Sequence, residues 1–374
     1  MKKIGIITFH NSYNCGSMME SYAIQTVIQR LGYEVEIINF SSKGQQEIYS
    51  VRFKNNSIKN ILKNIILLPH EKRIKNNNRQ YEEFKNKYFN LSKEYHQSSE
   101  IIEKYDIVIA GSDQIWNITI DDYDDAYFLN WVKKAKKIAY APSFGAKKIQ
   151  DNTDDVSKYI KLLNAFDAIS IRENNGQKWI MDLIDKKVPV VLDPTLLLDL
   201  CDYEKIICKY KKTFQKYIFF YAPTFDKEIC KFVQKISNKY NMKVITWSSK
   251  SFYLRRIKKY GFQIVDSESP EIYLNLIKNA ELVITTSFHG TIFSTIFRNR
   301  FITVKNGNMY GSDDRVLTLL KQMKLENRLM SFSFNNNYNY LEEVDYTDYE
   351  SVISGLKEKS LTYLKNSLEE KNEK

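Results

Sequence analysis

Residues 3–40 read KIGIITFHNSYNCGSMMESYAIQTVIQRLGYEVEIINF. The run from Lys3 to Phe9 is short, rich in β-branched residues and almost continuously apolar, which is typical of a parallel strand buried on both faces. Apolar residues then recur at helical spacing from Met18 to Leu31, and Glu34 to Phe40 has the composition of a second strand. This stretch therefore predicts a β-α-β unit.

The same alternation continues along the chain in two series. The first predicts strands at residues 107–110, 137–142, 168–171 and 189–192, with helices that end near residues 166 and 184. The second predicts strands at residues 217–223, 243–247, 261–265 and 281–286, with helices at 227–240, 270–279 and 291–298. Such alternation indicates doubly wound parallel sheets. We therefore predict an α/β fold of two Rossmann-like domains facing a cleft, which resembles the GT-B architecture of sugar-transfer enzymes.

Length and composition agree with this organisation. A chain of 374 residues is long for one core and suits two domains. We expect an N-terminal domain at residues 1–195, a C-terminal domain at 216–345 and a helical tail at 346–374. No apolar stretch approaches the roughly 20 residues that span a bilayer, and the start of the chain lacks the pattern of a signal peptide. The four scattered cysteines fit reduced thiols rather than a structural zinc site, so we expect a cytoplasmic protein.

The chain is basic, with a formal net charge of +11 that favours an anionic partner. Residues 52–87 are the most basic segment. Within it five apolar residues fall on one helical face, namely Ile58, Ile61, Leu62, Ile65 and Ile66. Such a helix either lies on an anionic membrane surface or packs its apolar face into the core. We expect no nucleic-acid partner, because no recognised module combines aromatic residues with Lys or Arg.

Polar residues follow the first strand, where ligands of open parallel sheets bind. Asn14, Gly16 and Ser17 occupy this position. Gly16 and Ser17 open the predicted helix, whose exposed backbone N–H groups can hold an anion. The alternative is a tight turn with Ser17 as the helix cap. The sequence is not the GxGxxG fingerprint, so a dinucleotide is disfavoured.

Two further strands also end in polar, glycine-bearing turns. The strand at 107–110 runs into GSDQIWN, where Asp113 and Gln114, beside Ser112, can hydrogen-bond hydroxyl groups and Trp116 can stack on a sugar face. The strand at 137–142 runs into a turn with Ser143 and Gly145 that allows a ligand to approach closely. We expect these residues to line the cleft.

Charged residues close the first series. Arg172 follows the strand at 168–171, where its guanidinium can bind a carboxylate or phosphate at the mouth of the cleft, or pair with Glu173 or another acid. The acidic cluster Asp121–Asp125 contains the Asp-x-Asp spacing with which some glycosyltransferases hold a divalent ion. A solvated loop is the other interpretation of this cluster.

The strand at 281–286 runs directly into SFHG, which places His289 at the start of a helix. The chain has only four histidines, so a catalytic imidazole has few candidates. A histidine beside a helix N-terminus sits where anions bind and can act as acid or base near neutral pH. The helix dipole favours the neutral imidazole there. A histidine that only caps or packs the turn is the alternative.

The order of these motifs resembles the polysaccharide pyruvyl transferase family along nearly the whole chain. The resemblance rests on Asn14, Gly16, Ser17 and Tyr22-Ala23, on GSDQIWN, SFGA, Ser170-x-Arg172-Glu173 and Asp193-Pro194-Thr195, and on TSFHG and the RVLTLLKQMKLENR segment from Arg315. It implies transfer of a pyruvyl group from phosphoenolpyruvate to two hydroxyls of a sugar in a cell-surface polysaccharide such as a capsule, which forms a cyclic ketal. It implies His289 as the acid/base and no metal or organic cofactor.

The resemblance also divides the cleft between the substrates. We expect the glycan acceptor on the N-terminal domain and the donor on the C-terminal domain, with Arg172, Ser287, Gly290 and Thr291 at the donor. Another branch of the family has Arg where this chain has Ser287, and Arg298, Arg300 or Lys305 are candidates to replace its charge. The alternative function is a GT-B-type glycosyltransferase with a nucleotide-sugar donor.

Overall fold

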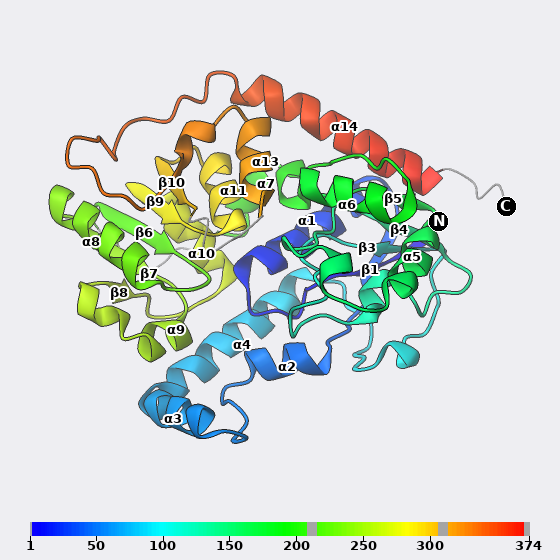
Figure 1. Cartoon of the computed structure of the whole chain (residues 1–374), viewed down its shortest axis with the longest axis horizontal. Helices are drawn as coiled ribbons and strands as arrows, with labels where there is room; N and C mark the ends of the chain where they lie inside the picture. The colour runs from blue at the N-terminus through cyan, green and yellow to red at the C-terminus, as the bar shows by residue number, and fades with distance from the viewer. Residues whose placement is uncertain (1, 208–214, 306–312, 370–374) are drawn as a thin grey trace.

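The computed structural model describes residues 2–207, 215–305 and 313–369. Its N-terminal half contains a five-stranded sheet in the order β2-β1-β3-β4-β5, and every pair of neighbouring strands is parallel (Figure 1). The strands are β1 (Lys3–Ile7), β2 (Glu34–Ile37), β3 (Ile107–Ala110), β4 (Lys136–Ala139) and β5 (Ala168–Ile169). Helices α1 (Cys15–Arg30), α2 (Lys43–Tyr49), α3 (Ile58–Leu67), α4 (Glu71–Tyr88), α5 (Val156–Asn164) and α6 (Asn174–Ile184) join or follow them.

The C-terminal half contains a six-stranded parallel sheet in the order β11-β10-β9-β6-β7-β8. Its strands are β6 (Tyr217–Tyr221), β7 (Lys243–Thr246), β8 (Gln263–Ile264), β9 (Leu282–Thr285), β10 (Phe301–Val304) and β11 (Leu329–Met330). The helices are α8 (Lys227–Tyr240), α9 (Ser249–Leu254), α10 (Pro270–Lys278), α11 (Phe288–Ile296) and α13 (Arg315–Gln322). Two parallel α/β sheets confirm the predicted fold class, and the cavities described below lie between the two halves.

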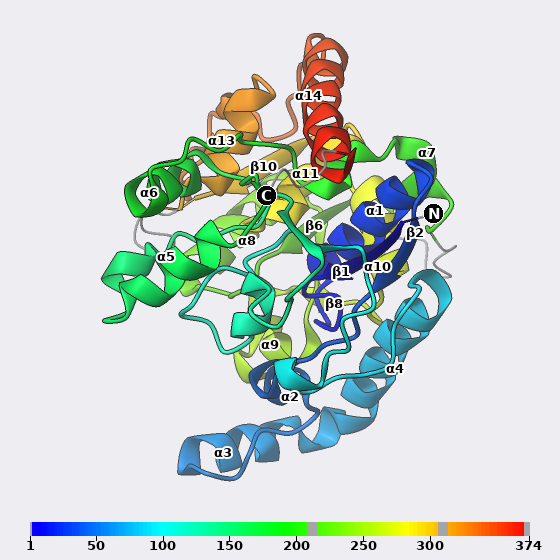
Figure 2. The same cartoon turned by 90° about the vertical axis from the view of Figure 1, so that its right-hand side faces the viewer.

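A connecting segment and a long final helix tie the two halves together. The segment contains a short 3₁₀ turn, Pro194–Leu197, and α7 (Leu200–Glu204). Helix α14 (Tyr349–Glu369) begins beside α11, where Tyr349 contacts Thr295. It then crosses to the N-terminal half, where Ser360 Oγ accepts a hydrogen bond from Leu192 N at 3.0 Å and Tyr363 donates to the Ala139 carbonyl (Figures 1 and 2).

The hydrophobic core is continuous across the two halves. One cluster of buried side chains includes Met19 and Ile24 of α1, Leu276 of α10, Phe293 of α11 and Leu364 of α14. Because apolar burial is the main favourable term in folding, this shared core holds α1 and α11 in a fixed relation. The candidate site lies at the N-termini of these same two helices.

Several element boundaries differ from the sequence predictions for local reasons. Helix α1 begins at Cys15 rather than Met18, because Asn14 and not Ser17 is its cap. Helix α11 begins at Phe288, so His289 lies inside its first turn. Residues 189–192 form a single bridge, Ile171 to Val190, rather than a strand. Strands β10 and β11 were not predicted, and the exact domain limits stay a prediction.

No helix among the described ranges combines the length and the apolar character needed to cross a membrane.

The shared core makes a stability prediction. Leu364 of α14 is fully buried, so Leu364→Ala should lower the free energy of unfolding by about 2–5 kcal/mol. Leu200→Ala, at a side chain that is 40% exposed, should change it by about 0.5 kcal/mol or less. Urea denaturation of both variants checks this, and equal losses would contradict the role given to α14.

Candidate active site

The site forms where the N-termini of α1 and α11 meet. Asn14 caps α1, and its Oδ1 accepts a hydrogen bond from Gly16 N at 2.9 Å. Gly16 packs directly on the ring of His289: a Cβ atom at Gly16 would lie 2.2 Å from His289 Nδ1. Only glycine permits this approach, which explains the glycine in the Asn-x-Gly turn.

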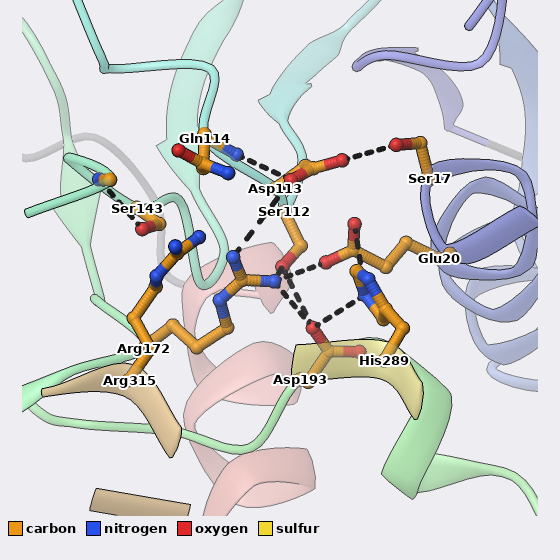
Figure 3. A network of polar contacts seen from close by, with 12 residues as sticks. Ser17, Glu20, Ser112, Asp113, Gln114, Ser143, Arg172, Asp193, His289 and Arg315 are labelled. Atoms are coloured by element: carbon orange, nitrogen blue, oxygen red, sulfur yellow. Dashed lines mark hydrogen bonds and ion pairs between the residues drawn. The ribbon is translucent and has the colours of Figure 1, made fainter. Parts of the chain in front are cut away.

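His289 points toward two buried carboxylates (Figure 3). Its Nε2 lies 3.3 Å from Glu20 Oε2 and 3.6 Å from Asp193 Oδ2. Burial alone would lower the pKa of His289, but the negative charges of Glu20 and Asp193 outweigh burial and raise its pKa to about 10. The expectation that the helix dipole keeps this imidazole neutral is therefore wrong, because nearby full charges exceed the dipole effect.

Arg172 lies at the centre of the same cluster and is almost fully buried. Its Nη1 donates to Glu20 Oε1 at 2.6 Å and to Asp193 Oδ2 at 2.7 Å, and its Nη2 lies 3.9 Å from Asp113 Oδ1. Its guanidinium also sits 4.3 Å from the ring centre of Phe288. Arg172 is thus paired with acids other than Glu173, and it forms part of the cavity wall rather than the mouth of the cleft.

Two donors of Arg172 are still available to a ligand. Among the described residues, Nε and Nη2 of Arg172 find no hydrogen-bond acceptor although both are buried. Buried donors without a partner are unfavourable, and Arg172 lines a cavity. An anion in that cavity would supply the missing acceptors.

The three carboxyl groups of the cluster differ in proton affinity. Burial raises the pKa of Glu20 well above its usual value, and the nearby Asp193 and Asp113 raise it further. Burial also opposes ionisation of Asp113 and Asp193, but His289 and Arg172 hold the pKa of both below the usual value. Glu20 is therefore the one of these three carboxyl groups whose pKa lies above its usual value, and it lies 3.3 Å from His289 Nε2.

A small cavity of about 100 Å³ opens on this cluster between the two halves of the molecule. Its walls carry cationic side chains from both halves: Arg172, His289, Lys305 and Arg315. Arg315 is held by Asp313, with Nε and Nη2 donating to the two carboxylate oxygens at 2.9 and 2.6 Å. Cavity and cations together suit a small ligand with more than one negative charge.

A larger cavity of about 390 Å³ adjoins the small one and shares Asn14, Tyr221 and Pro223 with it. Its walls are rich in aromatic side chains, namely Tyr13, Tyr49, Phe53, Tyr81, Tyr221 and Trp247. Lys250 and several Asn and Ser side chains add polar groups. Aromatic walls with a few polar groups are typical of pockets for organic ligands of moderate size.

Some of the predicted cleft residues of the N-terminal half line the small cavity, and others lie behind its wall. Asn14, Asp113 and Gln114 line the small cavity. Ser17 donates to Asp113 Oδ2 at 2.5 Å, and Ser112 donates to the Ala141 carbonyl at 2.9 Å, so these two hydroxyls fix the turn around Asp113.

Trp116, Ser143 and Gly145 lie away from the cavity. Trp116 is fully buried and stacks on Phe128 with ring centres 5.1 Å apart, so the prediction that it stacks on a sugar is wrong. Ser143 Oγ accepts a hydrogen bond from Gly145 N at 3.0 Å. A Cβ at Gly145 would collide with Gln114 Oε1. These residues support the site rather than contact a ligand.

Of the residues predicted at the donor, some line the small cavity and others only support the helix. Ser287 lines the small cavity and caps α11, accepting from Gly290 N at 3.3 Å. Gly290 lets α11 pack against Thr285 of β9. Thr291 is buried, with its Oγ1 2.7 Å from Thr303 Oγ1. Gly290 and Thr291 therefore set the start of the helix and do not line the cavity.

Of the three cations considered in place of an Arg at position 287, one lies at the site. Lys305 lines the small cavity. Arg298 pairs with Glu350, and Arg300 pairs with Glu281 at 2.7 Å and with Glu343, so both lie away from it.

Sequence reasoning missed Glu20, Asp193 and Arg315 as site residues. Asp193 and Arg315 belong to motifs of the family resemblance, but no local pattern indicates that they reach the cleft. Glu20 could have been identified from the sequence, because it is the only charged residue of α1 before Arg30. A lone carboxylate on a buried helix face needs a partner.

The other three histidines do not belong to this cluster. His10 is bonded to Asn39, His70 stacks on Tyr253 and His96 contacts Gln46.

A metal ion would compete with cations that the site already contains. Within the described residues, Glu20, Asp193 and His289 are the one group whose ligand atoms lie within 4.8 Å of one another. Arg172 Nη1 bridges the two carboxylates of that group, and this geometry places a guanidinium charge where an ion would bind. In the cluster Asp121–Asp125, Asp124 caps a 3₁₀ turn and Asp125 pairs with Lys158 at 2.5 Å, so these two carboxylates already have partners within the loop.

The chain belongs to the polysaccharide pyruvyl transferase family, since the sequence model of that family matches residues 14–308. The match contains every motif of the site up to Lys305, including Gly16, Arg172 and His289. The protein is therefore a transferase of a family that acts on polysaccharide acceptors. A comparison with curated protein sequences gives no match.

Solved structures resemble the chain at low sequence identity. A putative UDP-N-acetylglucosamine 2-epimerase from Listeria monocytogenes has 8% identity and a TM-score of 0.49, with 99% of this chain and 97% of that chain covered. MnaA of S. aureus with UDP has 14% identity, the same TM-score and 99% coverage of both chains. The heptosyltransferase WaaC of E. coli with ADP has 10% identity and a TM-score of 0.40, with 95% and 99% covered. Likenesses of this size carry no information about the ligand of this chain.

The contact between Gly16 and His289 can be tested directly. Gly16→Ala places a methyl group against Nδ1 of the imidazole, and a displacement of about 1 Å at a reacting group costs roughly 100-fold in rate. We expect a loss of that size in kcat/KM. Gly355→Ala in α14, where an added Cβ meets nothing within 4 Å, is the matched control and should keep full activity. Similar rates for the two variants would contradict the contact.

Proposed function

We propose that this protein transfers the pyruvyl group of phosphoenolpyruvate to a sugar diol and forms a cyclic ketal in a cell-surface polysaccharide. The observation that carries the proposal is the small cavity with Arg172, His289, Lys305 and Arg315 in its walls. Phosphoenolpyruvate is a small molecule with a carboxylate and a phosphate, and guanidinium groups bind both. Family membership supports the same reaction.

The cluster supplies the proton that the reaction needs. The proton held by the Glu20–His289 pair is transferred to the methylene carbon of phosphoenolpyruvate, and the adjacent carbon becomes electrophilic. The first sugar hydroxyl adds to that carbon and returns its proton to the pair. The bond from carbon to the phosphate oxygen then breaks, and the second hydroxyl closes the ring while its proton leaves with inorganic phosphate. No metal or organic cofactor takes part in this sequence.

The larger cavity is our proposed acceptor site. It shares Asn14, Tyr221 and Pro223 with the small cavity, so a sugar bound there would lie next to the donor. Stacked Tyr13 and Tyr81, with ring centres 5.3 Å apart, contribute a flat apolar wall. The residues that line this cavity come in equal numbers from the two halves, and the donor cations are also divided between both halves.

Ligand binding tests the donor. Phosphoenolpyruvate should raise the thermal midpoint of the purified protein, since a ligand at about 100 times its Kd stabilises by about 2.7 kcal/mol. Arg315→Gln and Lys305→Gln should each reduce this shift, whereas Arg298→Gln, at a side chain paired with Glu350 away from the cavity, should not. Stabilisation by a nucleoside diphosphate and not by phosphoenolpyruvate would favour the nucleotide-sugar alternative instead.

Turnover tests the acid. His289→Ala should lower the release of phosphate from phosphoenolpyruvate and acceptor by at least about 100-fold. It should leave the phosphoenolpyruvate-induced thermal shift measurable, because Arg172, Lys305 and Arg315 remain. His96→Ala, at a histidine that contacts Gln46 and lines neither of the two cavities, is the control. Full activity in His289→Ala would remove this residue from the mechanism.

The pH profile tests the role of Glu20. With the pKa of His289 raised to about 10, the acid form of His289 persists through neutral pH and is lost only as the pH rises toward that value. Glu20→Gln removes the charge that contributes most to the increase, so the alkaline limb of kcat/KM should move to lower pH. A residue that only supported the fold would lower activity at all pH values without moving the limb, and an unmoved limb would contradict our assignment.

A further inference from the structure

Helix α3 exposes its apolar face to solvent. Ile58 is 78% exposed and Ile65 61%, and the other members of the stripe, Ile61, Leu62 and Ile66, range from 41 to 55%. Leu68, directly after the helix, is 59% exposed. These six residues, which we call the α3 stripe, are most of the large exposed hydrophobic side chains of the described chain. Core packing of this face, the alternative left open by the sequence, is therefore wrong.

The helix turns its polar side to the protein instead. Asn64 Oδ1 accepts a hydrogen bond from Phe53 N, and Asn64 Nδ2 donates to the Phe53 carbonyl, each at 2.9 Å. Lys63 lies 4.4 Å from the ring centre of Phe53. Leu67, also away from the stripe, is buried. A surface helix of a soluble protein normally has the opposite orientation, so this orientation requires an apolar partner outside the chain.

The surroundings of the stripe are basic. Residues 52–87 contain ten Lys or Arg and three Glu. No described carboxylate forms an ion pair with Lys59, at the edge of the stripe, or with Lys72, just beyond the end of α3, and both side chains are exposed. Figures 1 and 2 show α3 at the outer edge of the molecule, away from both sheets.

We propose that the α3 stripe binds the surface of an anionic lipid bilayer. A helix with an apolar face bordered by lysines lies in the plane of a membrane, with its apolar side chains in the acyl boundary and its cations at the headgroups. The charge of the segment selects anionic lipid over neutral lipid. A protein partner fits less well, because α3 has ten residues and spans about 15 Å, which is short for the roughly 800 Å² per partner of a stable interface.

This membrane contact would bring the larger cavity to the bilayer. Tyr49 of α2, Phe53, and Ile74 and Asn77 of α4 line that cavity, and these residues flank α3 in the chain. A helix bound at the headgroups thus places the cavity beside the membrane, where the glycan of a lipid-linked acceptor projects. Only this last step rests on the proposed function, since binding to lipid does not require turnover.

The experiment is vesicle flotation with the full chain. The native protein should float with vesicles of phosphatidylcholine and phosphatidylglycerol and much less with phosphatidylcholine alone. Replacement of the stripe by the set Ile58→Gln, Ile61→Gln, Leu62→Gln, Ile65→Gln, Ile66→Gln and Leu68→Gln should lower partition at least about tenfold. A double variant, Lys59→Gln with Lys72→Gln, should lower it roughly fivefold per lysine.

Two controls distinguish binding through the α3 stripe from general apolar adhesion and from catalysis. The set Ile102→Gln, Met181→Gln and Leu200→Gln removes exposed apolar side chains elsewhere and should bind vesicles like the native chain. His289→Ala should also bind like the native chain, so loss of the proposed reaction and loss of membrane binding give different results.

Three outcomes would overturn the proposal. One is a native chain that does not bind anionic vesicles. Another is a stripe variant that binds them as well as the native chain. The third is a native chain that sediments as a dimer and does not bind vesicles, together with a stripe variant that is monomeric, which would assign the stripe to a second copy of the chain.

Discussion

The buried ion cluster around Arg172 is the interaction on which the site depends. A guanidinium, an imidazole and three carboxyl groups come from five separate segments of the chain, and all are almost fully removed from water. Removing charges from water is costly unless each is compensated. Arg172 compensates Glu20 and Asp193 together, and this bridge fixes α1, the connecting segment and the turn after β5 at one point. Although burial opposes ionisation of Asp193, His289 and Arg172 together hold its pKa well below the usual value.

Much of the fold could be predicted because it depends on local patterns. Buried parallel strands are short apolar runs, and helix α8 shows its bounds, Lys227–Tyr240, in its own spacing of apolar residues. The first residue of α11 and the cap of α1 were harder to predict. Moving the start of a helix by about one turn changes the spacing of its apolar residues very little. Strand β11 has two residues and forms only because β10 is beside it.

The site could be predicted in part. His289 was found because histidine is rare in this chain and a strand leads directly to it, and Gly16 was found because glycine marks a turn. The sequence shows that Trp116 follows a strand, which suggested a ligand contact. It does not show that the side chain points into the core. Glu20, Asp193 and Arg315 were missed because their roles come from tertiary neighbours that are distant in the chain. The exposed stripe of α3 could not be predicted for a similar reason. The spacing of apolar residues in a helix is the same whether that face packs into the core or faces solvent.

The packing of Gly16 against His289 has a consequence for how the two halves of the chain can change. The glycine and the carboxylates belong to the N-terminal half, and the imidazole belongs to the C-terminal half. The two halves are therefore not interchangeable parts. Consider a chimera of this N-terminal half and the C-terminal half of a distant relative. Its site would form only if the histidine of the relative packed on Gly16 at the same distance as His289 does here. A substitution at this contact in one half must therefore be matched by a substitution in the other half.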